Sequence, residues 1–83
     1  MIYLAITPAG LTDAMRIATS TDAVWCGSGA VSDVEFALMR DKPSRFIYSF
    51  TDDTATDDLD GAVHTIAEHH PGQTIWVEAL PSP

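Results

Sequence analysis

The segment Cys26-Gly27-Ser28-Gly29 contains the residue types that come closest to a reactive site in this chain. It follows a short apolar run and precedes a segment with helical features. Between a strand and a helix, backbone N–H groups can lower the pKa of a thiol and hold an oxyanion. The thiolate phosphatase pattern also requires an arginine six residues after the cysteine, where this chain has Ser32. We therefore expect Cys26 to be a buried, inert residue at a strand end.

The two glycines of the same segment also suggest a dinucleotide-binding loop. Gly27 and Gly29 match the first two glycines of that motif, but the third glycine is absent. A whole Rossmann half with an acidic ribose partner does not fit comfortably in a chain of 83 residues. No cofactor is therefore expected from these residues.

A third group with possible chemistry lies on the predicted last helix. Asp60, His64 and Glu68 recur at every fourth position and so share one helix face, with His69 and His70 just beyond. Such a stripe gives only two ligands good geometry for a divalent metal, and a third must come from elsewhere. We therefore interpret it as a solvated polar face, and no dedicated metal site is predicted.

The densest group of charges is acidic and lies between positions 52 and 60. It lacks the glycine and the terminal glutamate of a calcium-binding EF-hand loop, so calcium binding is not expected. Such a cluster can present a negative surface to a basic partner, although charge runs are usually solvated loops and helix starts. The cluster consists of Asp52, Asp53, Asp57, Asp58 and Asp60.

Composition limits the classes of partner that these residues can serve. The net charge is −8, with 4 basic against 12 acidic residues, which argues against direct binding to nucleic acid or to an anionic membrane. No apolar run approaches the ~20 residues of a membrane span, and no signal peptide is evident. The single cysteine cannot form an internal disulfide, so a reduced, cytoplasmic protein is the simplest interpretation.

The segment from Ser44 to Thr51 is predicted to be the central strand. It alternates strictly, with Phe46, Tyr48 and Phe50 on one face, and alternation of aromatic and β-branched residues is typical of strands. Three aromatic rings on one face would bury more apolar area than any other eight residues of the chain. We expect at least two of these rings to be buried.

The remaining segments predict one small α/β domain over residues 1–83, with a disordered tail at 81–83. Strands are expected at 2–6, 23–26 and 74–79, and helices near 8–19, 33–41 and 57–70. Residues 33–41 are ambiguous, because a capping box favours a helix while an alternating pattern allows a strand. The order is therefore βαβαβαβ with a four-stranded sheet covered by two or three helices, or a ferredoxin-like βαββαβ.

These observations favour a non-enzymatic interaction module that binds a protein partner or a second copy of itself. The expected contact residues are aromatic side chains on the outward face of two strands, with charged residues as a rim. They are Tyr3 and Trp76, with Arg40, Lys42, Arg45, Asp52 and Asp53. The alternative is a small enzyme or ligand-binding domain that uses the strand-end loops around Thr7, Cys26 and Gly27 to Gly29. A helix over residues 33–41 would favour that alternative.

Overall fold

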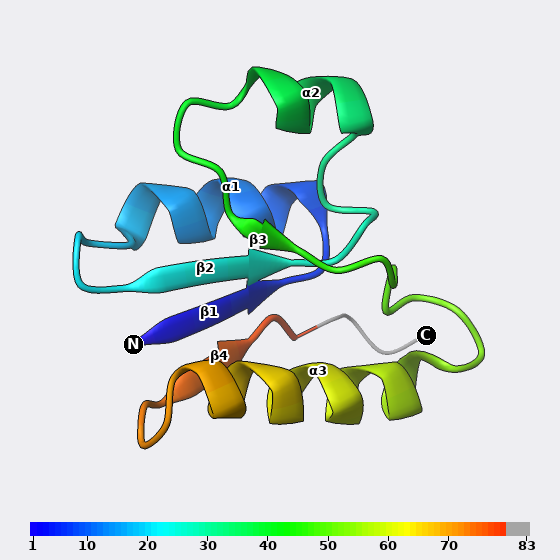
Figure 1. Cartoon of the computed structure of the whole chain (residues 1–83). Coiled ribbons are helices and arrows are strands. Elements are labelled where there is room, and N and C mark those ends of the chain that lie inside the picture. The colour runs from blue at the N-terminus through cyan, green and yellow to red at the C-terminus, as the bar shows by residue number, and fades with distance from the viewer. Residues whose placement is uncertain (80–83) are drawn as a thin grey trace.

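A computed structural model describes residues 1–79 as an α/β sandwich with a four-stranded parallel sheet and three helices (Figure 1). The expected disordered tail at 81–83 lies outside the described residues. The βαβαβαβ order is confirmed, so the ambiguous segment is a helix over residues 33–38 and not a hairpin strand, and residues 39–41 lie beyond its end. The elements are β1 (Ile2–Ala5), α1 (Pro8–Ile17), β2 (Ala23–Cys26), α2 (Asp33–Leu38), β3 (Ser44–Arg45), α3 (Ala55–His69) and β4 (Ile75–Val77).

The strands lie side by side in the order β3-β2-β1-β4, so β3 and β4 form the two edges of the sheet. Helices α1 and α2 lie on one side of the sheet and α3 lies on the other (Figure 1). In the parallel register, Ile2 of β1 is opposite both Ala23 of β2 and Ile75 of β4. Side chains at these three positions therefore point to the same face, which is the α3 side.

Local sequence explains where the helices begin. Thr7 is the N-cap of α1, its hydroxyl oxygen accepts the Gly10 N–H at 3.0 Å, and Pro8 takes the first helical position. In α2 the Ser32 oxygen accepts the Glu35 N–H at 3.1 Å, and the Ser32 hydroxyl donates to the Glu35 carboxylate at 3.0 Å. The predicted cap is therefore present, with Glu35 bonded to the Ser32 hydroxyl in place of the Ser32 N–H, and it favours the helix at residues 33–38.

The buried side chains form two clusters, one on each side of the sheet. On the α1 side the cluster is small and consists of Ala5, Leu11, Cys26 and Ala30. On the α3 side it is larger, because β1 places its bulky aliphatic residues there. That cluster consists of Ile2, Leu4, Ile6, Phe50, Ala62 and Ile66. The centre of the sheet is thus formed by β1 and β2.

The prediction of a central strand at 44–51 was wrong. Only Ser44–Arg45 form a strand, and this strand is at the sheet edge. The chain then leaves the sheet, and Phe50 has a φ of 64°, which no strand residue adopts. Phe50 is fully buried and Phe46 packs partly against the core, whereas Tyr48 is exposed. The expectation that at least two of the three rings are buried was therefore also wrong, because only Phe50 is buried and Phe46 is half-buried.

Within residues 1–79, no helix has the length and apolar character that crossing a membrane would require.

Candidate functional site

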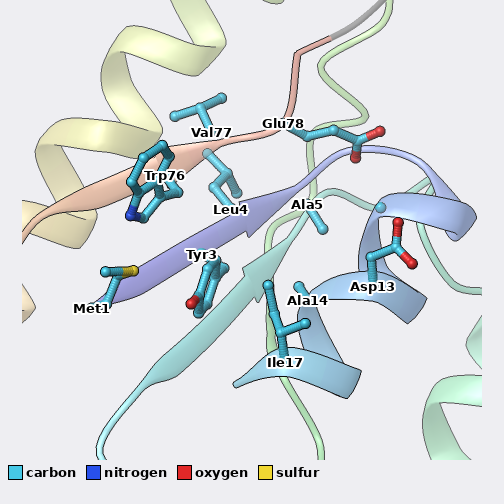
Figure 2. A pocket seen from close by; sticks show the side chains of 11 residues that line it. Met1, Tyr3, Leu4, Ala5, Asp13, Ala14, Ile17, Trp76, Val77 and Glu78 are labelled. Carbon is cyan, nitrogen blue, oxygen red and sulfur yellow. The ribbon is translucent and has the colours of Figure 1, made fainter. Parts of the chain in front are cut away.

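An open apolar groove of about 460 Å³ lies between α1 and β4 (Figure 2). Figure 2 shows Tyr3 of β1 between Trp76 of β4 and Ile17 of α1. Tyr3 and Trp76 are register partners in neighbouring strands, so their side chains stand next to each other on the α1 side of the sheet. Five of the apolar residues that line the groove are together called the β4 surface: Met1, Tyr3, Ile17, Trp76 and Val77.

The groove exists because the helix layer on this side is too narrow for the sheet. The backbone of α1 lies close to β1 and β2 but not to β4, and the helix whose backbone lies close to β4 is α3, on the opposite face (Figure 1). Trp76 is consequently 56% exposed and Ile17 is 51% exposed. Monomeric soluble proteins seldom leave large aromatic and aliphatic side chains together in water unless that surface contacts something else.

Glu78 closes one end of the groove and ties the end of β4 to the start of α1. One carboxylate oxygen accepts the N–H groups of Ile6 and Thr7 at 2.7 and 2.8 Å. The other oxygen accepts the Thr7 hydroxyl at 2.5 Å. Gly10 leaves room for this contact, because a Cβ at position 10 would overlap the Glu78 carboxylate. The N-terminal end of α1 is thus filled by a carboxylate of the same chain.

The pKa of Glu78 reflects this contact. Partial burial raises the pKa, but the hydrogen bonds from the Thr7 hydroxyl, the Thr7 N–H and the Ile6 N–H outweigh it and leave the pKa below its ordinary value. The carboxyl group is therefore held in its charged form. Asp13 is the other charged side chain that lines the groove, and Arg16 pairs with it at 3.3 Å.

The carboxyl ends of β1 and β2 were the second candidate site, and the chain itself fills this region. Cys26 is fully buried. Burial raises the pKa of its thiol, against a smaller lowering by the charge of Arg45. Gly27 lies beneath the Phe50 ring, and a Cβ there would approach that ring to 2.9 Å. Ser28 donates its N–H to the Tyr48 carbonyl at 2.9 Å. The segment after β3 thus covers the Cys26-Gly27 loop.

The predicted basic rim lies beside β3, at the sheet edge opposite the groove. Arg45 bonds to the Asp33 carboxylate at 2.6 Å and to the Ser28 and Val31 carbonyls at 3.0 and 3.1 Å. Lys42 donates to three carbonyl oxygens near the end of α2, at 2.7 to 3.0 Å. Both side chains therefore stabilise the loops around α2. Arg40 is exposed.

The predicted acidic residues are also separate from the groove. Asp52 and Asp53 lie exposed before α3, and Asp52 accepts the N–H and hydroxyl of Thr54 at 3.1 and 2.8 Å. On the last helix, His64 and Glu68 approach each other at 2.7 Å. Among residues 1–79, no group of three potential metal ligands comes together.

The structure therefore brings together two of the seven predicted partner-binding residues, Tyr3 and Trp76. It adds Ile17 and Glu78, which sequence reasoning missed. Ile17 carried a usable signal, because it is a large apolar residue outside the buried stripe of its helix. Glu78 carried none, because its bond to Thr7 joins residues 71 positions apart.

Comparisons with protein-family models, with curated proteins and with solved structures find no significant match to this chain.

Proposed function

We propose that this chain is a small acidic interaction module that binds a protein partner, or a second copy of itself, through the β4 surface. The observation that carries the proposal is the exposure of Trp76 beside Tyr3 and Ile17 in an open groove. Tryptophan and tyrosine supply large contact areas and are enriched at the energetic centres of interfaces. We do not propose nucleic acid or membrane lipid as the partner, because the net charge of −8 repels both. The proposed compartment is the cytoplasm.

The alternative function is a small enzyme or ligand-binding domain at the carboxyl ends of the strands. The parallel sheet and the helix at 33–38 favour it, because the loops after β1 and β2 then meet at one edge. Two contacts count against it more strongly. Phe50 lies over Gly27, and Glu78 occupies the start of α1. Slow alkylation of Cys26 in the folded protein is expected, and rapid alkylation at neutral pH would favour the enzyme instead.

The test for a protein partner uses a matched pair of substitutions at exposed apolar residues. Immobilised wild type, Trp76→Glu and Ile47→Glu are compared as baits in a cell lysate, and each retained protein is then purified and titrated against all three. Ile47 is 84% exposed and does not line the groove, so its substitution controls for added charge. We expect a protein that binds wild type and Ile47→Glu but not Trp76→Glu. Equal binding to all three would refute the role of the β4 surface.

Self-association is tested by sedimentation equilibrium over a range of protein concentrations. Wild type is compared with Trp76→Ala, which removes the largest exposed side chain of the β4 surface. A concentration-dependent mass that is lost in Trp76→Ala is the expected result for a homodimer. A strictly monomeric wild type would exclude self-association and leave a different protein as the partner.

A further inference from the structure

Strand β4 has one neighbour, β1, and its other side is a free edge in the part of the chain that the structure describes. The Thr74 carbonyl accepts the Ile2 N–H at 2.9 Å, and the Glu78 N–H donates to the Leu4 carbonyl at 3.0 Å. Bonding groups of successive strand residues alternate between the two sides of a strand. The N–H and C=O groups of Ile75 and Val77 therefore point away from β1.

The side chains at this edge are apolar on both faces of the sheet. Trp76 is 56% exposed on the α1 side, and Val77, whose register partner Leu4 faces α3, is 40% exposed on the other side. A helix docked in the groove would cover Trp76 and its neighbours on the α1 side but not the face of Val77 on the α3 side. An added strand would extend both faces and would also bond to the outward N–H and C=O groups. The edge therefore fits a strand better than a helix.

The charges around this edge favour a basic occupant. The two charged side chains that line the groove, Asp13 and Glu78, are both carboxylates, and Arg16 offsets only the first of them. The terminal ammonium group of Met1, which also lines the groove, is paired with Asp22 at 3.2 Å. The three other basic residues lie between positions 40 and 45, beside the opposite edge strand. A second copy of this chain would bring another net charge of −8 to the same place. Charge complementarity thus favours a different protein over a copy.

We infer that the β4 edge accepts an extended basic segment of a partner protein as a fifth strand. This inference rests on the proposed function of the β4 surface. Main-chain hydrogen bonds to Ile75 and Val77 would provide affinity, and contacts with Trp76 would provide selectivity for apolar side chains. Basic residues that alternate with apolar ones would complement the acidic groove.

The experiment uses synthetic peptides and the whole chain. The first probe is a capped peptide of about eight residues, which is within the usual range of strand lengths, in which valine alternates with lysine. The second is the same peptide N-methylated at every residue, which removes its main-chain donors on both edges. The third replaces lysine with glutamate, and the fourth is a longer amphipathic peptide of about 18 residues built from leucine, alanine and lysine, which favour a helix. Binding is measured by calorimetry and by amide NMR shifts.

We expect the first peptide to bind, to shift the Ile75 and Val77 amides and to protect them from hydrogen exchange. N-methylation should weaken binding by at least about tenfold, because several main-chain bonds are lost. Replacing lysine with glutamate should weaken it by a similar factor, and added salt should weaken the basic peptide. Trp76→Ala should weaken it, and Ile47→Ala should not.

Three outcomes would overturn the inference. Equal binding of the methylated peptide would show contact without strand pairing. Preference for the helical peptide would make the occupant of the groove a helix. Absence of binding by all four peptides would reject strand addition at this edge. None of these outcomes decides the proposed function. That function is tested separately by the bait experiment, which asks whether a partner protein needs Trp76 for binding.

Discussion

The two edge strands of this sheet differ in how their outer sides are protected. Strand β3 has only two residues, follows a buried proline at position 43, and holds Arg45 in three hydrogen bonds with the α2 loop. Strand β4 has three residues, all apolar, with Trp76 and Val77 exposed. Its nearest charged residue, Glu78, turns inward to Thr7.

This difference shows which edge of the sheet is protected by residues of the same chain and which edge is not. Proteins protect sheet edges with short strands, prolines, charges or covering loops, because unprotected edges pair with other chains. The β3 edge has a short strand, a proline and a charged residue. The β4 edge, over the residues described, has only its shortness. The comparison therefore supports the proposal that the contact surface lies at β4, and the following substitutions test both edges.

The largest effect is expected at Phe50, which covers the loop beyond β2. Phe50→Ala should reduce the free energy of unfolding by about 3–5 kcal/mol, because it removes a fully buried ring from the core. The Cβ is retained, so the strained backbone at a φ of 64° is equally strained in the variant. Urea unfolding, followed by circular dichroism, measures the loss.

Tyr48→Ala is the matched control, since Tyr48 is an exposed aromatic residue of the same segment. It should cost less than about 1 kcal/mol. Losses of similar size at positions 48 and 50 would mean that the segment after β3 does not cover the core as described.

A smaller effect is expected at Arg45, which holds the β3 edge to the α2 loop. Arg45→Met keeps the side chain's length but removes its bonds to Asp33 and to the Ser28 and Val31 carbonyls. We expect a loss of about 1.5–3 kcal/mol, the range for hydrogen bonds to a charged group. Arg40→Met, an exposed neighbour, should stay within about 0.5 kcal/mol in the same unfolding experiment. Equal effects would contradict the structural role of Arg45.

The β3 side also shows how far the sequence predicts this fold. Helix starts were predictable because a cap needs only nearby residues, as at Thr7 and Ser32. The strand at 44–51 was not, because alternation also describes a segment that packs its aromatic residues over a sheet end. In the structure the Phe46 ring packs against that of Trp25 in β2, with 5.2 Å between the ring centroids, and this contact joins segments that are distant in the sequence. No local pattern carries that information.

The candidate site was also predictable only in part, because local patterns show which face a side chain occupies but not which strands are neighbours. Period-two alternation placed Tyr3 and Trp76 on the outward faces of their strands. The sequence does not say that β4 pairs with β1, and this pairing is what places the two aromatic side chains next to each other. The basic residues were assigned to a rim from charge alone, whereas the structure shows Lys42 and Arg45 bound within the chain. Short-range patterns do not reveal internal partners.

Glu78→Gln is expected to have an effect that depends on pH. The folded pKa lies below the ordinary value of 4.5, so the folded state binds the proton more weakly than the unfolded state does. The carboxylate therefore stabilises the fold fully above pH 4.5, and this contribution is lost as the pH falls through the lowered pKa. Wild type should be more stable than the variant at pH 7, and the difference should shrink in acid.

Thermal unfolding at several pH values measures this difference, and hydrogen exchange of β4 shows whether the strand loosens first. The variant should exchange faster at Trp76 than wild type, because Glu78 ties the end of β4 to α1. A constant stability difference across the whole range would show that the carboxylate charge does not contribute.

The smallest effect on stability is expected at Trp76, where the contrast between the edges is greatest. Trp76→Lys gives β4 the kind of charge that edge strands commonly carry. The side chain is already 56% exposed, so the substitution loses mainly its cross-strand contact with Tyr3, worth about 0.2–1 kcal/mol. Trp76 thus contributes little to the stability of the fold, while its apolar side chain leaves the β4 edge open to unwanted pairing. If the loss in urea unfolding instead approached that of Phe50→Ala, Trp76 would be a core residue. The exposed edge would then need no partner to explain it.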